Sequence, residues 1–215
     1  FLQPNTTNPE NSSASTYYMT PTSTGYTVGT GDNINQNTYT FVDWLWKAGG
    51  GSGSSNDASA TGIGSIDSTY SANTDAGFSI VSYTGTGSAA TVKHGLSSAP
   101  EMMIVKRRDA GTGGWYVYHE GEDASAPEDK YLELQATGAV ADAAWPWNDT
   151  APTSSVFSIG SDVNISGSGN TYIAYCFHSV DGYSKFGTFT GNSNADGTFV
   201  YTGFRPAYVM IKRVD

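Results

Sequence analysis

The chain has 215 residues, of which 38% are hydrophobic and 14% charged, and its net charge is −10. An acidic chain lacks the basic surface that displaces counterions from phosphates, so the composition argues against a nucleic-acid partner and against an electrostatic membrane anchor. No run of about 18 apolar residues occurs, so we expect no membrane insertion.

The residue types favour an all-β protein. Aromatic residues, Thr, Val and Ile form short runs interrupted by Gly and Asn, while Leu and Glu are scarce. Cys176 is the only cysteine, so no internal disulfide is possible and we expect oligomerisation to add stability. The first residue is Phe1, so we expect a processed product or a segment of something longer.

The predicted strands follow one another closely along the chain. They lie at residues 77–85, 90–96, 100–108, 113–120, 130–137, 154–161 and 170–180. Residues 100–108 form a continuous apolar run with a charged end, which is typical of a central strand. Six or seven short strands, no helix and regular turn signals predict an antiparallel β-sandwich, of jelly-roll or immunoglobulin-like type.

Parts of the chain repeat. Residues 21–48 align without a gap with residues 152–179, and aromatic residues fall on aromatic residues. Near the C-terminus, "VMIKRVD" at 209–215 repeats "MIVKRRD" at 103–109. Apolar positions, turn glycines and prolines are kept together, so the repeat is not a chance match of Ser/Gly-rich text. A repeat of this length indicates tandem domains.

The repeat predicts four segments and two lobes. Residues 1–48 are the second half of a β repeat unit, and residues 49–76 are a Gly/Ser-rich linker, extended or mobile. Residues 77–180 are a complete β-sandwich unit, and residues 184–215 are the first part of a further unit. Either the chain is a window from a longer tandem protein, or its two incomplete units complete one another, within one chain or between chains.

Six side chains are candidates for contact with a glycan or a partner. Aromatic faces pack on the apolar side of sugar rings, and neighbouring polar groups bind the hydroxyls. The alternative is that these aromatic residues fill the core, as they commonly do in β-sandwiches. The candidates are Trp115, Tyr116, Tyr118, His119, Trp145 and Trp147.

Catalytic and metal sites have weak signals. The sequence "HEGED" at 119–123 offers clustered carboxylates for Ca²⁺ or for acid–base chemistry, but we favour a solvated acidic loop. The loops at 31–37 and 162–170 lack the Asp spacing of a calcium motif. His94 is best explained as a surface or strand-end residue, and the basic residues 106–108 as the end of a buried strand. We therefore predict no catalytic residue, no metal and no cofactor.

Several stretches resemble a known family. They include "AGFSIVSYTGTGSAATVKHGLSSAPEMMIVKRRD", "WYVYHE", "WNDTAPTSSVFSIGS", "NTYIAYCFHSVDGYSKFGTFTGN" and "ADGTFVYTGFRPAYVMIKRVD", and the resemblance covers nearly the whole chain. They are similar to a β-rich tandem-repeat family found in tail-fibre-like virion proteins of marine bacteriophages. The resemblance implies a phage particle component: a fibre, a spike or a decoration protein.

We expect a non-enzymatic virion structural protein on the particle surface that forms homo-oligomers and contacts other virion proteins. The alternative is an adhesion module of a phage tail fibre or a bacterial surface protein, binding a host receptor or a surface glycan. An enzyme such as a glycan depolymerase needs two converging carboxylates, and only residues 119–123 offer any.

Overall fold

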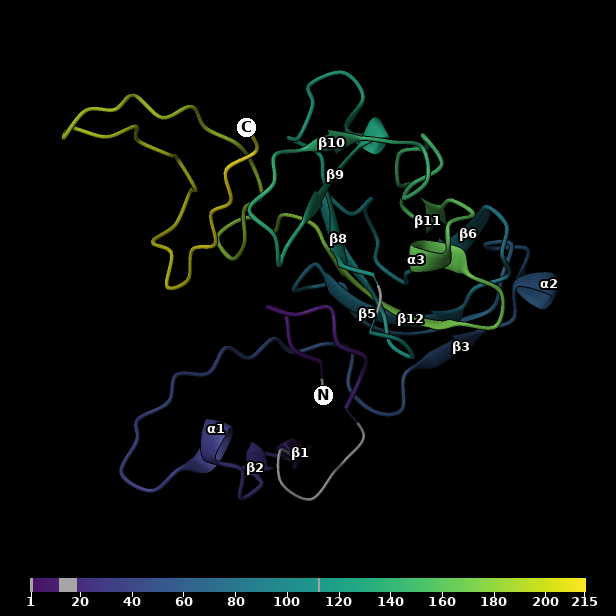
Figure 1. Ribbon diagram of the computed structural model, residues 1–215, viewed down its shortest axis with the longest axis horizontal. Helices are drawn as coiled ribbons and strands as arrows, with labels where there is room; N and C mark the ends of the chain where they lie inside the picture. Colours follow the sequence, from purple (N-terminus) through teal and green to yellow (C-terminus); the bar gives the residue numbers. More distant parts are fainter. Residues whose placement is uncertain (1, 12–18, 112) are drawn as a thin grey trace.

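A single antiparallel β-sheet dominates the protein (Figure 1). The structure is a computed structural model, in which residues 2–11, 19–111 and 113–215 are described. The remaining positions of the predicted half-unit 1–48, residues 1 and 12–18, lie outside the described residues. The all-β prediction is confirmed, because the described residues lie mostly in antiparallel strands with few helices.

The elements have the following bounds in chain order. They are β1 Met19–Pro21, β2 Tyr26–Val28, α1 Asp32–Asn35, β3 Ser54–Asn56, α2 Ala58–Thr61, β4 Ser68–Asn73, β5 Phe78–Thr84, β6 Ala90–Lys93, β7 Met102–Arg107, β8 Trp115–His119, the 3-10 turn η1 Pro127–Asp129, β9 Lys130–Glu133, β10 Ala141–Asp142, β11 Val156–Ile159, α3 Val163–Ser166 and β12 Thr171–Phe177.

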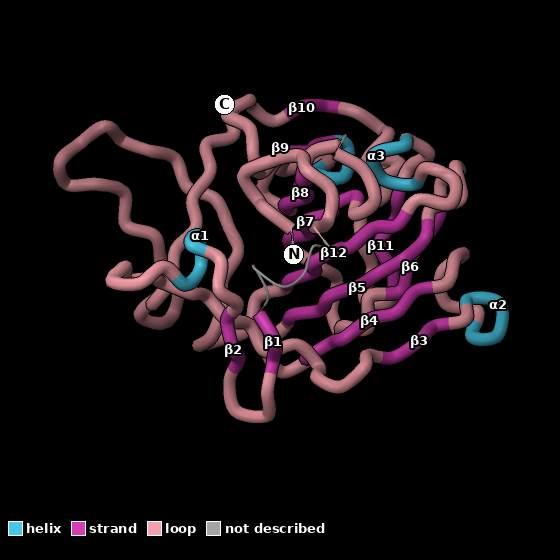
Figure 2. The backbone as a smooth tube through the Cα atoms, turned by 60° about the horizontal axis from the view of Figure 1, so that its bottom comes forward, coloured by secondary structure: helices cyan, strands magenta, loops and turns pink. Residues whose placement is uncertain are grey.

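The main sheet has eight strands in the order β10-β9-β8-β7-β12-β5-β4-β3, and its pairs are antiparallel. Strand β12 lies between β5 and β7, so the last strand of the chain is central in the sheet (Figure 2). Strands β6 and β11 form a separate two-stranded sheet, and β1 and β2 form another. We predicted no helix, but three single helical turns, α1, α2 and α3, interrupt the connections.

Buried and partly exposed side chains alternate along β12, as expected of a strand inside a sheet. Tyr172, Ala174 and Cys176 are fully buried on one face, while the residues between them point to the other. Their cluster also contains residues of β6 and β11, such as Val92 and Phe157, which are fully buried as well. The two-stranded sheet therefore packs on one face of the main sheet and shares its largest core.

The opposite face of the main sheet has a smaller cluster, formed by Met102, Val117 and Leu132. Phe186 and Val214 from the C-terminal segment pack against it. Residues 3–10 cover a neighbouring part of this face. There the backbone N–H of Glu10 donates to the carbonyl of Arg108 at 2.7 Å, and the two side chains form an ion pair.

The linker prediction for residues 49–76 is wrong in its central part. Residues 54–56 and 68–73 are β3 and β4, which extend the main sheet beyond β5, and α2 lies between them. The side chain of Asp57 caps α2 by accepting from the N–H of Ala60 at 3.0 Å. This sheet edge is rich in small polar residues, and of β4 only Tyr70 and Ala72 pack against the large core cluster.

Two terminal segments depart from this architecture. We define them as residues 19–48 and 184–215, and call them the N- and C-terminal segments. The first contains only the β1–β2 hairpin and α1, and the described part of the second contains no strand or helix beyond a bridge between Val180 and Ser184. Both form loops that extend away from the main sheet, and the C-terminal segment returns to it at its end, where the N–H of Val140 donates to the carbonyl of Val214 (Figure 1).

Candidate assembly surface in the terminal segments

Most of the predicted glycan-contact residues lie in the interior, so this part of the prediction is corrected. Trp115, Tyr116, Tyr118 and Trp147 are at most 5% exposed. The first three belong to β8, which has covered residues on both faces, so its successive aromatic side chains pack inward on either side. A buried ring offers no face to a sugar.

Hydrogen bonds fix these indole rings in place. Trp147 Nε1 donates to the carbonyl of Lys130 at 2.8 Å, and Trp115 Nε1 donates to the carbonyls of Gln3 and Thr6 at 3.1 and 3.0 Å. Trp145 is only half-buried, and its ring centroid lies 4.8 Å from that of Tyr116. Five of the six candidates therefore lie in the core or pack against it. This agrees with the alternative that these aromatic residues fill the core.

The sixth candidate, His119, belongs to the acidic loop 119–123. Its Nδ1 accepts from the N–H of Gly121 at 3.0 Å, and the ring is half-buried. The loop is not fully solvated as we expected, because both carboxylate oxygens of Glu122 are buried without a hydrogen-bond partner. Burial raises the pKa of Glu122 to about 8. Among the described residues, no group of three His, Cys, Asp or Glu side chains is placed to hold a metal ion.

Two other titratable side chains are buried with structural partners. His94 directly follows β6, so it is a strand-end residue as one of our two interpretations had it, but it is fully buried and not at the surface. Its Nδ1 accepts from the N–H of Leu96, and its Nε2 lies 3.0 Å from the carbonyl of Thr153. Burial lowers the pKa of His94 to about 4, so the ring is neutral near pH 7. Lys106 is also fully buried, and its Nζ donates to the carbonyls of Thr7 and Gly113.

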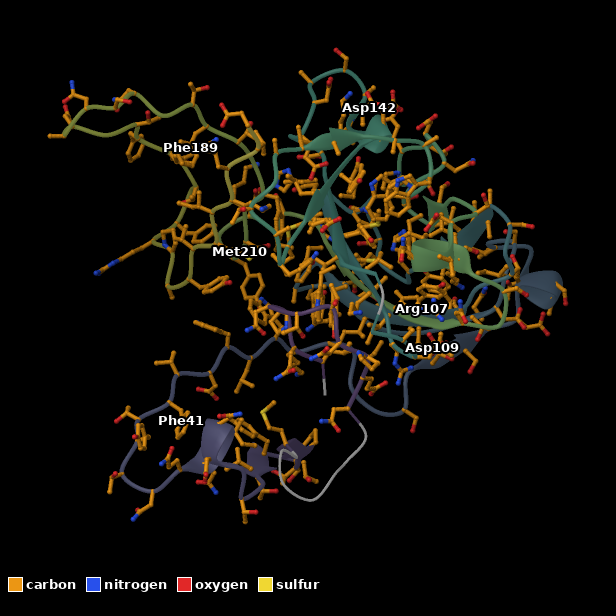
Figure 3. The ribbon with its side chains drawn as sticks, in the orientation of Figure 1. Phe41, Arg107, Asp109, Asp142, Phe189 and Met210 are labelled. Carbon is orange, nitrogen blue, oxygen red and sulfur yellow. The ribbon has the colours of Figure 1, made fainter. Side chains whose placement is uncertain are left out.

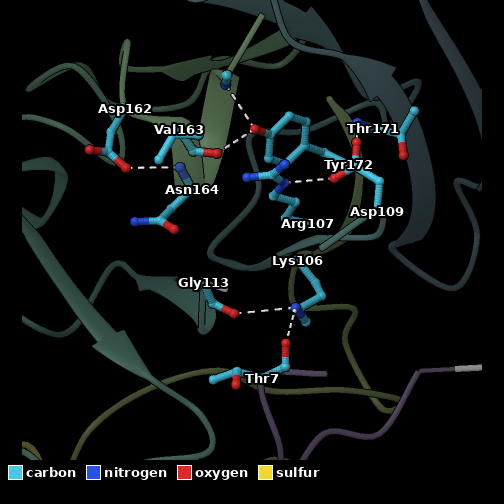
Figure 4. A network of polar contacts seen from close by, with 11 residues as sticks. Thr7, Lys106, Arg107, Asp109, Gly113, Asp162, Val163, Asn164, Thr171 and Tyr172 are labelled. Atoms are coloured by element: carbon cyan, nitrogen blue, oxygen red, sulfur yellow. Dashed lines mark hydrogen bonds and ion pairs between the residues drawn. The ribbon is translucent and has the colours of Figure 1, made fainter. Parts of the chain in front are cut away.

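A polar network fixes the end of β7 against β12 (Figure 4). The Arg107 guanidinium pairs with Asp109 at 2.6 Å, and the other carboxylate oxygen of Asp109 accepts from the N–H of Thr171 at 2.9 Å. The Tyr172 hydroxyl donates to the carbonyl of Val163 at 2.6 Å and accepts from the N–H of Gly167 at 2.8 Å. These contacts tie the α3 turn to the main sheet.

Large exposed apolar side chains gather in the terminal segments. Among the described residues, all of those exposed by more than about a third lie in these two segments, apart from Val163 and Tyr183. They are Met19, Val28, Tyr39, Phe41, Val42, Trp44, Leu45, Trp46, Phe189, Phe199, Val200, Tyr201, Tyr208, Val209, Met210 and Ile211. Figure 3 shows Phe41, Phe189 and Met210 on these loops, away from the sheet.

The two terminal segments meet at one aromatic cluster. The ring of Tyr208 lies 5.6 Å from that of Trp46 and 5.7 Å from that of Trp44, measured between centroids. The glycan prediction passed over both tryptophans, although the run "TFVDWLWKA" already alternates apolar residues as a strand does. Exposed apolar surface on this scale marks an interaction site.

Local backbone geometry in the N-terminal segment recurs in the main unit. The N–H of Thr22 donates to the carbonyl of Gly25 as that of Thr153 does to Val156, at 2.7 and 2.9 Å. Helices α1 and α3 occupy corresponding places in the aligned ranges 21–48 and 152–179, and each has four residues. The aligned sequences therefore adopt the same turns.

Comparisons with known proteins give a family but no function. A family model described as a domain of unknown function (DUF7483) matches residues 1–215. No curated protein and no solved structure matches the chain. Within the described residues, no helix has the length and apolar character needed to cross a membrane.

Proposed function

The chain belongs to the DUF7483 family of domains of unknown function, and from its surface we propose that it is a non-enzymatic structural protein of a bacteriophage particle. It assembles as an oligomer, with itself and with other virion proteins, through its terminal segments. The observation that carries this proposal is the concentration of exposed apolar side chains in residues 39–46 and 199–211. The assignment to a bacteriophage particle rests on the resemblance to tail-fibre-like virion proteins.

The energetics support assembly. Burying one large apolar side chain stabilises a contact by about 1.5–3 kcal/mol, and an exposed cluster of them promotes association. Val42, Leu45 and Ile211 are each 68–76% exposed. A partner that covered several such residues would gain enough free energy to offset the entropy lost on association.

The proposal includes the finer architecture. We propose that the main sheet with β6 and β11 is one sandwich-like lobe, and that the terminal segments belong to a second lobe in tandem with it. Its support is the common core shared by the two sheets, together with the turns of α1 and α3 at aligned positions.

The role of the buried titratable groups fits a non-enzymatic protein. His94 and Lys106 have shifted pKa values because burial disfavours their charged forms, and both bind backbone groups. Cys176 is fully buried, and burial raises its thiol pKa, so it is a poor nucleophile. These shifts therefore have structural causes.

The alternative of a host-receptor or glycan-binding module rests on different residues from those first predicted. Its remaining support is the exposed rings of Tyr39, Trp44 and Trp46. Two of these rings already contact Tyr208, which favours protein assembly over sugar binding.

Light scattering across a dilution series tests the proposal. We expect the mass of the whole chain to rise with concentration, and the double variant Phe199→Ser, Tyr201→Ser to stay monomeric, because these side chains are 85% and 77% exposed. Val163→Ser is the matched control, since Val163 is exposed but lies outside the terminal segments. A wild-type chain that is monomeric at every concentration would reject assembly through this surface.

A further inference from the structure

We propose that residues 40–46 are the central strand of a second sheet, paired between residues 184–190 and 208–213 of the same chain. This inference deepens the proposed function, on which it rests for the role of the terminal segments, by naming what they bind first. The N-terminal segment would thus lie between the two C-terminal stretches of the same chain.

The sequence correspondence defines the three strands. Residues 40–46 align with β12, and residues 184–190 and 208–213 align with β5 and β7. In the main sheet β12 pairs with β5 on one side and with β7 on the other. The C-terminal segment therefore holds two outer strands without their middle one, and the N-terminal segment holds the middle one without its neighbours.

The backbone that leads into residues 40–46 has nearly the same dihedral angles as the backbone that leads into β12. The residues before α1 and α3, Gly31 and Asp162, have φ, ψ angles of −69°, 134° and −69°, 148°. Further on, Thr38 has a φ of 71° where Gly169 has 74°. A threonine adopts this left-handed conformation only at a cost in free energy. The turn that directs the chain into the next strand is therefore kept despite that cost.

Two residues of the main core have aligned counterparts that interact with each other. In the main unit Phe157 and Ala174 belong to the same buried cluster. The aligned residues are Tyr26 and Asp43, and the Tyr26 hydroxyl donates a hydrogen bond to the Asp43 carboxylate. Asp43 stands where the main unit has Ala174, and Tyr26 stands where it has Phe157. The added hydroxyl donates to the added carboxylate, so the two changes compensate.

The aromatic cluster gives the register. In the main sheet Phe177 lies directly opposite Met102. The aligned residues are Trp46 and Tyr208, and their rings touch, with centroids 5.6 Å apart. Trp44, two residues earlier, would be the diagonal neighbour of Tyr208, and it too is in contact, at 5.7 Å. Both contacts agree with one register, in which Leu45 lies opposite Val209.

The points at which the two terminal segments leave the main sheet favour pairing within one chain. The carbonyl of Lys47 accepts from the side-chain amide of Asn73 at 3.0 Å, and Asn73 lies opposite Phe78 at the end of β4. Phe78 in turn lies opposite Phe177, shortly before the bridge at Ser184. Residues 46 and 184 therefore leave the same end of the main sheet, roughly two strand spacings or about 10 Å apart. Such short tethers give a high effective concentration.

Engineered disulfides test the register. In the main sheet the N–H of Arg108 donates to the carbonyl of Thr171, so Cys176 and Met103 form a pair without mutual backbone hydrogen bonds, the closer kind. The equivalent pair is Leu45 and Val209. We expect Leu45→Cys with Val209→Cys to oxidise rapidly to a disulfide within one chain.

Two further variants protect this experiment against a folding failure. Phe41→Cys with Arg213→Cys is a second pair in the same register, and Leu45→Cys with Met210→Cys is the control, shifted by one residue onto the opposite face. The buried native Cys176 is common to all three. Equal oxidation of the control, no disulfide in either in-register pair, or disulfides only between chains would each overturn the proposal. Because the chain mass is measured separately, a monomer with the expected disulfide would reject oligomerisation and keep this inference.

Discussion

The ring of Trp46 lies nearly perpendicular to the ring of Tyr208, with centroids 5.6 Å apart, although the residues come from opposite ends of the chain. Edge-to-face rings at this distance attract one another beyond their area of contact. The contact joins the two segments that hold most of the exposed apolar side chains. One unit divided between the two terminal segments would bring these two rings together.

Trp147 stabilises the main unit from its centre. The side chain is fully buried, and its Nε1 bonds to the carbonyl of Lys130. We expect Trp147→Ala to lower the free energy of unfolding by about 3–5 kcal/mol, because it leaves a cavity. Trp44→Ala is the control, since Trp44 is 62% exposed, and it should leave the main transition unchanged. Urea denaturation measures both; equal losses would contradict the assigned packing.

His94 makes stability fall in mild acid. Its pKa is lowered to about 4 in the folded protein from 6.5, so the unfolded chain binds a proton that the folded chain excludes. The stabilising effect is complete above pH 6.5 and is lost as the pH falls through 4, by about 3 kcal/mol in total. His94→Thr should flatten this slope in denaturation measured from pH 7 to 4. An unchanged slope would refute the assignment.

Glu122 has the opposite pH dependence. Its folded pKa is raised to about 8 from 4.5, so the folded protein holds a proton that the unfolded chain releases. The contribution is fully present below pH 4.5 and is lost as the pH rises through 8. Glu122→Gln should therefore stabilise the protein at pH 9 by about 3–5 kcal/mol relative to wild type, and have little effect at pH 4. Thermal unfolding at the two pH values checks it, and equal effects at both would exclude a buried carboxyl.

Tyr26 and Asp43 should depend on each other. Tyr26→Phe leaves the carboxylate without its donor, and Asp43→Ala leaves the hydroxyl without its acceptor. The double variant recreates the apolar pair found at Phe157 and Ala174. We expect each single change to speed amide exchange of residues 40–46 several-fold and the double variant to exchange more slowly than either. Additive effects would show that the two side chains act independently.

Local patterns predicted the main strands well. The alternation through Tyr172, Ala174 and Cys176 and the apolar run at 100–108 correspond to β12 and β7, the central pair. Strands β3 and β4 were missed, because their Ser- and Asn-rich sequence has the composition of a linker and its pairing with β5 is a tertiary effect.

The candidate site was harder to predict. The run Trp115–His119 carries aromatic side chains on both strand faces, and such a run does not say whether other parts of the protein cover those faces, so the sequence could not tell the buried Trp115 from an exposed ring. In the terminal segments the strand pattern is present, yet residues 40–46 are not in a strand. Pairing there needs residues from the other end of the chain, which no local signal encodes.

Amide hydrogen exchange of the whole, unmodified chain tests the central claim most directly. If the terminal segments complete one unit, the amides of residues 41–46 and 209–213 exchange slowly and together, because strand pairing protects their N–H groups. If those amides exchange as fast as exposed coil while β5, β7 and β12 stay protected, the terminal segments do not pair, and our account of them is wrong.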